Sequence, residues 1–230
     1  MASRSLYEEL ARTAKALANP ERLRLVELLS QGARTVEVLA ERAAQPLGTT
    51  SHHLQKLAAA GLVNRERSGR HVVYSLADTS VAEFWSALRC FGEAHSGELK
   101  TAVQELRSRR ERAGVVTADE LEELLSRRKV TLIDVRPAEE FAASHLAGAR
   151  SVPLSELAAR LRELPKRRLV VAYCRSPYCQ LADRAVEILE RHGFKARRLE
   201  EGVQEWGAHG RRLEKDRGDQ DVGRESFERV

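Results

Sequence analysis

The spacing of apolar residues changes between residues 97 and 114, and this change constrains the fold more than any other feature of the chain. Before it, apolar residues recur at helical spacing, as they do from Leu6 to Leu17. After it, helical segments alternate with short runs rich in β-branched residues, such as Val130–Val135. A chain of 230 residues is long enough for two domains with separate cores. The sequence therefore predicts a mainly α-helical domain followed by an α/β domain.

The boundary segment is itself helical in pattern and ends in a basic stretch before Ala113-Gly114 stops it. We interpret it as a helical basic connector. Residues 211–230 carry six charges of each sign and few large apolar residues, which is typical of a disordered tail. The predicted organisation is a first domain over 1–96, the connector over 97–114, a second domain over 115–212 and the tail over 213–230.

Cysteine content and hydropathy indicate where such a chain works. The sequence holds three cysteines, Cys90, Cys174 and Cys179, which argues against a disulfide scaffold and for a reducing compartment. Its N-terminus does not resemble a signal peptide, and it has no run of about 18 apolar residues that could span a membrane. We therefore expect a cytoplasmic protein without membrane contact, and we expect no cofactor.

The first domain has the element order of a winged helix. The predicted helices are Leu6–Leu17, one starting at Pro20 with Asn19 as its N-cap, Val36–Ala43 capped by Thr35, Thr49–Ala60 and a long one after Asp78. The third and fourth are joined by Pro46-Leu47-Gly48, which makes a helix-turn-helix. Leu62–Arg67 and Val72–Leu76 flank a glycine turn and predict a β-hairpin wing.

Polar side chains gather where this arrangement would meet DNA. The fourth helix offers groups that suit base edges and nearby phosphates: Thr49, Thr50, Ser51, His52, Gln55 and Lys56. The wing offers cations that suit the DNA backbone or minor groove: Arg65, Arg67 and Arg70. A solvated polar helix face would carry similar residues, but the turn and the wing together favour DNA binding.

These segments resemble the ArsR family of winged-helix transcription regulators. The matching stretches are Lys15–Leu23, Thr50–Leu57 and Ala60–Val63. The resemblance implies a homodimer formed by the first and last helices of the domain. It also implies that two recognition helices enter successive major grooves of a double-stranded DNA operator.

The metal-sensing residues of that family are missing from this sequence. The predicted third helix has no cysteine pair, and Asp78 is followed by Ser80 where a histidine is needed. Phe91 and Ala94 occupy the places of the second histidine and the glutamate. We therefore expect no metal site. The role of Cys90 stays open between a small apolar residue of the dimer helix and a redox- or sulfur-responsive thiol.

The second domain alternates strands and helices, which predicts a largely parallel sheet. The predicted strands include Val130–Val135, Arg168–Tyr173 and Lys195–Leu199. Ligands of such sheets bind outside the carboxyl ends of the strands, where Asp134 and Cys174 fall.

A short polar loop follows the second of these strands and precedes a helix. Its residues are Cys174, Arg175, Ser176, Pro177, Tyr178, Cys179 and Gln180. The free backbone N–H groups at the start of the helix, together with the helix dipole, predict a lowered pKa for Cys174 and therefore a reactive thiolate. The alternative is a buried structural cysteine.

The second domain resembles the rhodanese family of single-domain sulfurtransferases. The matching stretches are Leu132–Arg136, Glu139–Phe141, His145–Ala149, the cysteine loop and Glu200–Trp206. The resemblance implies that Cys174 takes a sulfane sulfur as a persulfide and passes it to a nucleophile. The amides from Arg175 to Gln180 would hold the persulfide, and Arg175 would bind a small donor such as thiosulfate, polysulfide or persulfide. Asp134 and Arg136 would brace the loop from beneath.

Two departures from related cysteine loops refine this reading. Phosphatases need an arginine at the sixth position after the cysteine, and Gln180 stands there, so phosphate-ester chemistry is disfavoured. Cys179 stands where active sulfurtransferases often carry arginine. It could resolve a Cys174 persulfide by forming a disulfide, or it could simply fill space.

The two halves together predict a DNA-binding transcription regulator whose rhodanese domain senses or processes reactive sulfur. Two alternatives stay open. One is a sulfurtransferase tethered to a DNA-binding dimer, and the other is a catalytically silent rhodanese fold that binds a partner.

Overall fold

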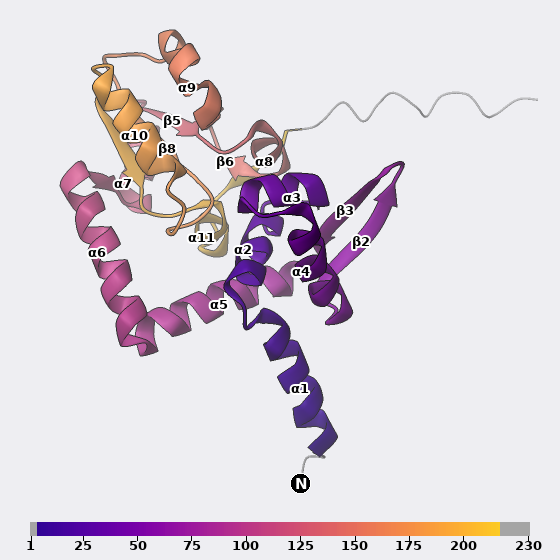
Figure 1. Cartoon of the computed structure of the whole chain (residues 1–230). Helices are drawn as coiled ribbons and strands as arrows, with labels where there is room; N and C mark the ends of the chain where they lie inside the picture. The colour runs from indigo at the N-terminus through magenta and orange to yellow at the C-terminus, as the bar shows by residue number, and fades with distance from the viewer. Residues whose placement is uncertain (1–3, 217–230) are drawn as a thin grey trace, which may run out of the picture. The chain divides into compact units, whose positions relative to one another are not determined.

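The computed structural model describes residues 4–216 (Figure 1), and the chain forms two compact units that divide between Val103 and Gln104. The predicted connector is one helix, α6 (Gly97–Ala113), and the division falls inside it. The first unit also contains α1 (Arg4–Leu17), α2 (Pro20–Leu29), β1 (Arg34–Thr35), α3 (Val36–Ala43), α4 (Leu47–Ala59), β2 (Val63–Ser68), β3 (His71–Leu76) and α5 (Thr79–His95).

Side-chain caps fix where the helices of the first unit begin. The carboxamide oxygen of Asn19 accepts hydrogen bonds from the backbone N–H groups of Glu21 and Arg22 at the start of α2. Thr35 caps α3 and Asp78 caps α5 in the same way. Each cap satisfies N–H groups that a helix leaves without an internal partner. The predicted starts of these three helices are confirmed.

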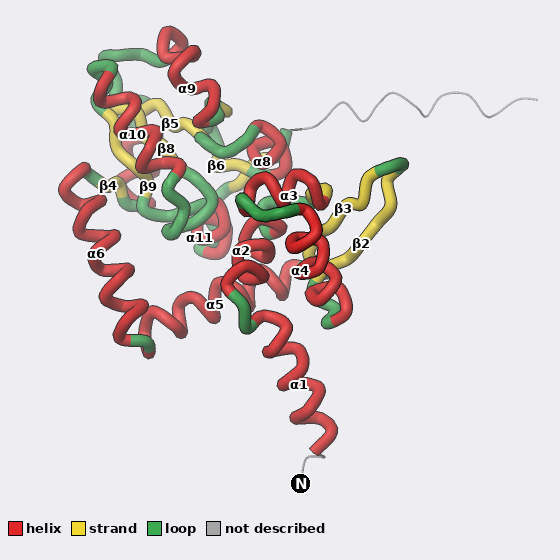
Figure 2. The backbone as a smooth tube through the Cα atoms, in the orientation of Figure 1, coloured by secondary structure: helices red, strands yellow, loops and turns green. Residues whose placement is uncertain are grey.

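The first unit is a winged helix-turn-helix built around one apolar core. Leu25, Leu39, Leu54 and Leu57 are fully buried at its centre. The three strands form an antiparallel sheet in the order β1-β3-β2, and β2 and β3 extend as the hairpin wing (Figure 2). Gly69 turns the hairpin with a φ of 59°, a backbone conformation that glycine adopts without strain.

The helix α4 starts two residues earlier than the sequence predicts. The carbonyl of Pro46 accepts the N–H of Thr50 at 3.0 Å, so the helical bonding already includes Leu47 and Gly48. The turn between α3 and α4 is therefore shorter than predicted. It is made by Ala44, which has a left-handed φ of 53°, and by Gln45 and Pro46.

The second unit is an α/β domain with a fully parallel sheet of five strands in the order β4-β9-β8-β5-β7. Its strands are β4 (Val115–Val116), β5 (Val130–Asp134), β7 (Arg150–Ser151), β8 (Leu169–Tyr173) and β9 (Ala196–Leu199). Its helices are α7 (Ala118–Ser126), α8 (Ala138–Ala143), α9 (Leu154–Arg160), α10 (Leu181–Arg191) and α11 (Val203–Ala208), with a 3-10 turn at Leu161–Glu163. The predicted fold class is confirmed.

Helices cover both faces of this sheet. Side chains of α9 and α10 pack with β5 and β8 in one core, represented by Leu157 and Ala185. Side chains of α7 and α11 pack in a second core, represented by Leu121 and Trp206. Coverage on both faces explains why every residue of β5 is buried, rather than every second one.

The sheet brings two of the predicted site positions to the same edge. Strands β5 and β8 are parallel neighbours, and Asp134 lies in register with Tyr173. Cys174 follows Tyr173 directly. The structure therefore places Asp134 and Cys174 at the carboxyl ends of adjacent strands, as the sequence predicts.

The sequence analysis missed the shortest strands. β4 lies along β9, and β10 (Leu213–Glu214) pairs antiparallel with β6 (His145–Leu146). The predicted tail therefore starts too early, because residues 213 and 214 belong to the second unit; residues 217–230 lie outside the described part of the chain. A strand of two residues is too short to show a period. None of the described helices combines the length and apolar character needed to cross a membrane.

Candidate functional site

The loop between β8 and α10 holds two thiols that are not joined by a disulfide. Cys174 stands at the end of β8 and is 1% exposed. Cys179 stands just before α10 and is half-buried. Its backbone N–H donates to the carbonyl of Ser176 at 3.1 Å, which closes the loop into a tight turn.

The surroundings of Cys174 favour its protonated form. Its Sγ lies 3.4 Å from the carbonyl oxygen of Cys179 and 3.9 Å from that of Ser176, and both oxygens accept hydrogen bonds. Burial raises the pKa of Cys174 well above its ordinary value, and the hydrogen bond to Cys179 adds to this. The burial of Cys174 therefore opposes the low pKa that the sequence analysis predicts for it.

The pKa of Cys179 is shifted in the opposite direction. The hydrogen bond from Cys174 is the largest cause, and with the charge of Arg175 and the backbone N–H groups of Leu181 and Arg175 it lowers the pKa of Cys179 to about 6. Both sulfurs meet the start of α10, because the backbone N–H of Ala182 acts to lower the pKa of Cys174 and that of Leu181 acts to lower the pKa of Cys179. At Cys174, burial outweighs this effect.

Arg175 is committed to a buried partner. Its guanidinium donates to both carboxylate oxygens of Glu140 on α8, at 2.9 and 2.7 Å, and Glu140 is 1% exposed. This fork-to-fork pair commits Nε and Nη2 of Arg175 to Glu140. Binding of a sulfur donor by Arg175 stays a prediction. Arg175 still supplies positive charge to Cys179.

The predicted ion pair between Asp134 and Arg136 is present and fully buried. Asp134 accepts from both the backbone and the guanidinium of Arg136, at distances from 2.6 to 3.0 Å. The guanidinium also donates to the carbonyl of Ser144 at 2.6 Å and lies 5.8 Å from the centre of the Tyr173 ring. These contacts fix the segment after α8 and the end of β8, from which the cysteine loop departs.

The remaining loop residues are packed rather than free. Ser176 is 4% exposed, and its hydroxyl accepts the N–H of Tyr178 at 3.3 Å. Pro177 is half-buried and Gln180 is exposed. Gly202, just before α11, lies against the backbone of Arg175 and Ser176 so closely that an added Cβ would clash with it.

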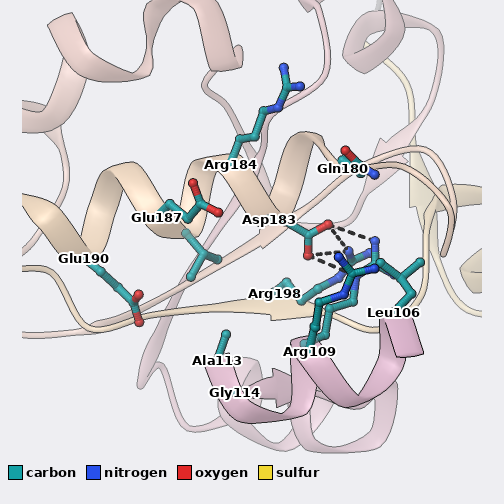
Figure 3. A pocket seen from close by; sticks show the side chains of 12 residues that line it. Leu106, Arg109, Ala113, Gly114, Gln180, Asp183, Arg184, Glu187, Glu190 and Arg198 are labelled. Carbon is teal, nitrogen blue, oxygen red and sulfur yellow. Dashed lines mark hydrogen bonds and ion pairs between the residues drawn. The ribbon is translucent and has the colours of Figure 1, made fainter. Parts of the chain in front are cut away.

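Three charged residues behind the loop were not singled out by the sequence analysis. Asp183 on α10 accepts from Arg198 on β9, and from Arg110 on α6. Figure 3 draws Asp183 with dashed lines to the nitrogens of neighbouring arginines, beside a cavity of about 350 Å³ between α6 and α10. Arg198 shares the buried face of β9 with Ala196, and a cation there needs a buried partner. Arg110 follows Val103 and Leu106 at helical spacing, which is the signal that could have found it.

The predicted DNA-binding face is largely exposed. Thr49, His52, Gln55 and Lys56 on α4 are exposed, Ser51 is half-buried, and the wing residues Arg65, Arg67 and Arg70 are exposed. Thr50 is a correction, because it is 0% exposed and its hydroxyl donates to the carbonyl of Pro46 at 3.2 Å. It shares a helix face with Leu54 and Leu57, so it packs in the core and does not reach DNA.

Comparison with known proteins identifies the two domains. The family model of the helix-turn-helix domain matches residues 17–66, and that of the rhodanese-like domain matches residues 117–209. The chain is 39% identical over 202 residues to the HTH-type transcriptional regulator Rv0324 of Mycobacterium tuberculosis, covering 88% of each chain. The chain belongs to this family of transcriptional regulators. Its first domain is an ArsR-type winged helix, and its second is rhodanese-like.

Other relatives match each half of the chain separately. The transcriptional regulator NmtR of M. tuberculosis is 43% identical over 75 residues, and the chain covers 62% of its length. The protein YqhL of Bacillus subtilis is 37% identical over 81 residues, and the chain covers 63% of its length. A homodimeric winged helix-turn-helix domain from Mycobacterium bovis is 35% identical with a TM-score of 0.39, covering 43% of this chain and 93% of that one.

The ArsR-type domain offers neither of its family's metal sites in the expected places. Asp78 caps α5 through the hydroxyl and N–H of Ser80, while Phe91 is 63% exposed. Among residues 4–216, no group of three or more histidine, cysteine or acidic side chains is arranged to hold a metal ion. Cys90 lies exposed on α5, so packing inside its own unit does not explain it.

Proposed function

We propose that this regulator binds operator DNA as a homodimer and responds to reactive sulfur through Cys174 and Cys179. The observation that carries the proposal is the contact between the two thiols, one buried and protonated, the other half-buried with a pKa of about 6. Such a pair is suited to thiol–disulfide chemistry, because a thiolate attacks and a neighbouring thiol resolves. We place this DNA-binding regulator in the cytoplasm as part of the same proposal.

The proposed dimer is supported by apolar side chains on the outside of the first unit. Leu6, Tyr7 and Leu10 on α1 are 58 to 67% exposed, and Phe84 and Phe91 on α5 are 51 and 63% exposed. Large apolar side chains gathered on two helices are typical of an interface. They lie on the first and last helices of the domain, where the family resemblance puts the dimer contact.

The structure favours one order of chemical steps. Cys179 thiolate attacks a sulfur–sulfur bond of a polysulfide and keeps one sulfane sulfur as a persulfide, while the shortened polysulfide leaves. Cys174 then attacks the Sγ of Cys179, the outer sulfur leaves as sulfide with the proton of Cys174, and a disulfide forms. Two thiols are oxidised and one sulfane sulfur is reduced, so electrons balance. The persulfide on Cys174 that the rhodanese resemblance implies is the reverse order.

Mass spectrometry after polysulfide treatment separates the two orders. We expect Cys174→Ser to accumulate a persulfide on Cys179, because the resolving thiol is absent. Cys179→Ser is expected to stay largely unmodified, because Cys174 is buried and protonated. Persulfide on Cys174 in the Cys179→Ser variant would instead support the order implied by the family. The wild type is expected to lose two hydrogens through disulfide formation.

The regulatory function is tested with a DNA fragment from upstream of the protein's own gene. We expect polysulfide to weaken binding of the wild type by about tenfold, or 1.4 kcal/mol, and a reducing agent to restore it. Cys179→Ser should not respond. Unchanged DNA affinity together with rapid sulfur transfer to cyanide would favour the tethered sulfurtransferase. No modification of either thiol would remove both sulfur-based functions and leave the partner-binding module.

A further inference from the structure

One residue outside the rhodanese-like match reaches into the cysteine loop. Arg110 lies in the last turn of α6, while the family model begins at residue 117. It stands among other arginines, yet it is 9% exposed whereas Arg109 and Arg112 are exposed. Its burial indicates that its side chain makes contacts within the protein that the side chains of Arg109 and Arg112 do not make.

The guanidinium of Arg110 holds the backbone of the loop. It donates to the carbonyl of Pro177 and, at 3.2 Å, to the carbonyl of Cys179. Because a trans peptide holds its C=O and the following N–H on opposite sides, these bonds also orient the N–H groups of Tyr178 and Gln180. One side chain therefore sets two peptide planes of the loop.

The carbonyl of Cys179 links Arg110 to both sulfurs. It lies 3.4 Å from the Sγ of Cys174 and belongs to the residue that carries the low-pKa thiol. Arg198 also donates to it, at 3.4 Å. A change in the position of this carbonyl would alter the hydrogen bonding of Cys174 and the place of Cys179 together.

Asp183 holds the guanidinium in place for this task. Its two carboxylate oxygens accept from Arg110 at 3.0 and 2.8 Å and from Arg198 at 2.8 and 2.9 Å. Burial acts to raise the pKa of Asp183, but the hydrogen bonds from both arginines outweigh it and lower the pKa. The carboxylate therefore stays charged, and it fixes the planar fork of Arg110 toward the loop.

We propose that Arg110 is a positioning residue of the sulfur site, through which the linker helix α6 becomes part of the cysteine loop. This inference rests on the proposed sulfur chemistry of Cys174 and Cys179. An ordinary ion pair with Asp183 would need no bond to the loop. The two loop carbonyls held by Arg110 make its role specific to the thiols. Oxidation of the two thiols changes the loop whose carbonyls Arg110 holds. It therefore changes the contacts of the last turn of α6.

The first test measures the pKa of Cys179 in the absence of any sulfur donor, from the pH dependence of its alkylation by iodoacetamide. We expect Arg110→Ala to raise this pKa by at least one unit, which means about tenfold less thiolate below the pKa. Arg110→Lys keeps the charge but not the planar fork, so we expect a smaller rise. Arg112→Ala, which removes an exposed charge from the same helical turn, should leave the pKa unchanged.

Thermal unfolding of each variant separates positioning from loss of fold. If Arg110→Ala does not fold, Arg110→Lys decides the outcome. An unchanged Cys179 pKa in a folded Arg110→Lys or Arg110→Ala protein would overturn the proposal. Because alkylation uses no sulfur donor, this result does not depend on whether the protein responds to reactive sulfur.

The second test uses the unaltered full chain. Amide hydrogen exchange is measured over residues 104–113 before and after polysulfide treatment. We expect faster exchange in this segment once the disulfide has formed, because the loop carbonyls shift away from Arg110. Disulfide formation with unchanged exchange would contradict the coupling to α6. Absence of any disulfide would contradict the proposed function and leave the alkylation result to judge Arg110.

Discussion

Cys174 and Cys179 show how two identical side chains in one loop acquire different chemistry. The strand end buries Cys174 and surrounds its sulfur with carbonyl oxygens, which stabilise a thiol. The helix start gives Cys179 backbone N–H groups and a nearby guanidinium, which stabilise a thiolate. The hydrogen bond between the two sulfurs strengthens both tendencies. Reactivity therefore follows the local donors and acceptors.

At the residue scale, the low pKa of Cys179 depends on the donor at position 174. We expect Cys174→Ala to move the midpoint of Cys179 alkylation upward from about pH 6, toward the ordinary cysteine value of about 8.5. Cys174→Ser is the matched control, because its hydroxyl can still donate to Cys179 and should keep the midpoint lower. Alkylation midpoints that stay near pH 6 in both variants would show that Arg175 and the helix N-terminus suffice to lower the pKa of Cys179.

At the element scale, the turn between α3 and α4 sets the angle of the DNA-reading helix. Ala44 ends α3 with φ 53° and ψ 47°, and its N–H donates to the carbonyl of Glu41 at 3.0 Å. A side chain in this left-handed conformation is strained, and glycine is the residue that removes the strain. The sequence holds alanine at this point, so the turn stores a small amount of free energy.

Replacing Ala44 with glycine therefore tests the turn. We expect Ala44→Gly to stabilise the winged-helix unit by about 0.5–1 kcal/mol, since relief of strain outweighs the added freedom of the unfolded chain. Ala102→Gly, at an exposed position inside α6, should destabilise the protein by about 1 kcal/mol. The measurement is the free energy of unfolding in urea. A lower free energy of unfolding for Ala44→Gly than for the wild type would contradict the inferred backbone strain at Ala44.

Most elements could be predicted from the sequence because their ends carry specific chemistry. Asn19, Thr35 and Asp78 cap helices by hydrogen bonds that need no knowledge of the fold. The two-residue strands β4 and β10 could not be predicted, because only tertiary pairing defines them. Helical spacing places Thr50 on the same face as the leucines of the core. The sequence analysis assigned it to the DNA-binding face instead, because its side chain is polar.

The candidate site was predictable as a segment and not as a set of contacts. The position of the loop between β8 and α10 followed from apolar runs on either side. Packing between elements distant in sequence decides how deeply each thiol is buried. It also decides which carboxylate pairs with Arg175. Arg110 is the clearest example, because its partner Asp183 lies on another helix. In the sequence, Arg110 is hard to tell apart from the surface arginines around it.

At the scale of the whole molecule, the DNA-binding domain and the proposed sulfur site reside in units with separate cores. The first unit packs around Leu25 and Leu54, and the second packs on both faces of its sheet. Each unit buries its own apolar side chains, which is the basis of independent folding. The helix α6 joins them, and Arg110 in its last turn donates to the carbonyl of Cys179 in the cysteine loop.

The salt dependence of DNA binding tests the wing in the full chain. If Arg67 meets a phosphate, Arg67→Ala should weaken binding on all sequences and reduce the slope of log affinity against log salt by about one. Arg167→Ala removes the same charge from an exposed position of the second unit and should leave the slope unchanged. Equal slopes for wild type and Arg67→Ala would place the wing away from the phosphates.

Gly202 has a genetic consequence. Any side chain at this position would run into the backbone of Arg175 and Ser176, although Gly202 contributes no functional group of its own. We therefore expect every missense allele of this codon to distort the cysteine loop and to leave the residues of the winged-helix core unchanged. Under the proposed function, codon 202 is a place where separation-of-function alleles arise, in which DNA binding persists and the response to reactive sulfur is lost.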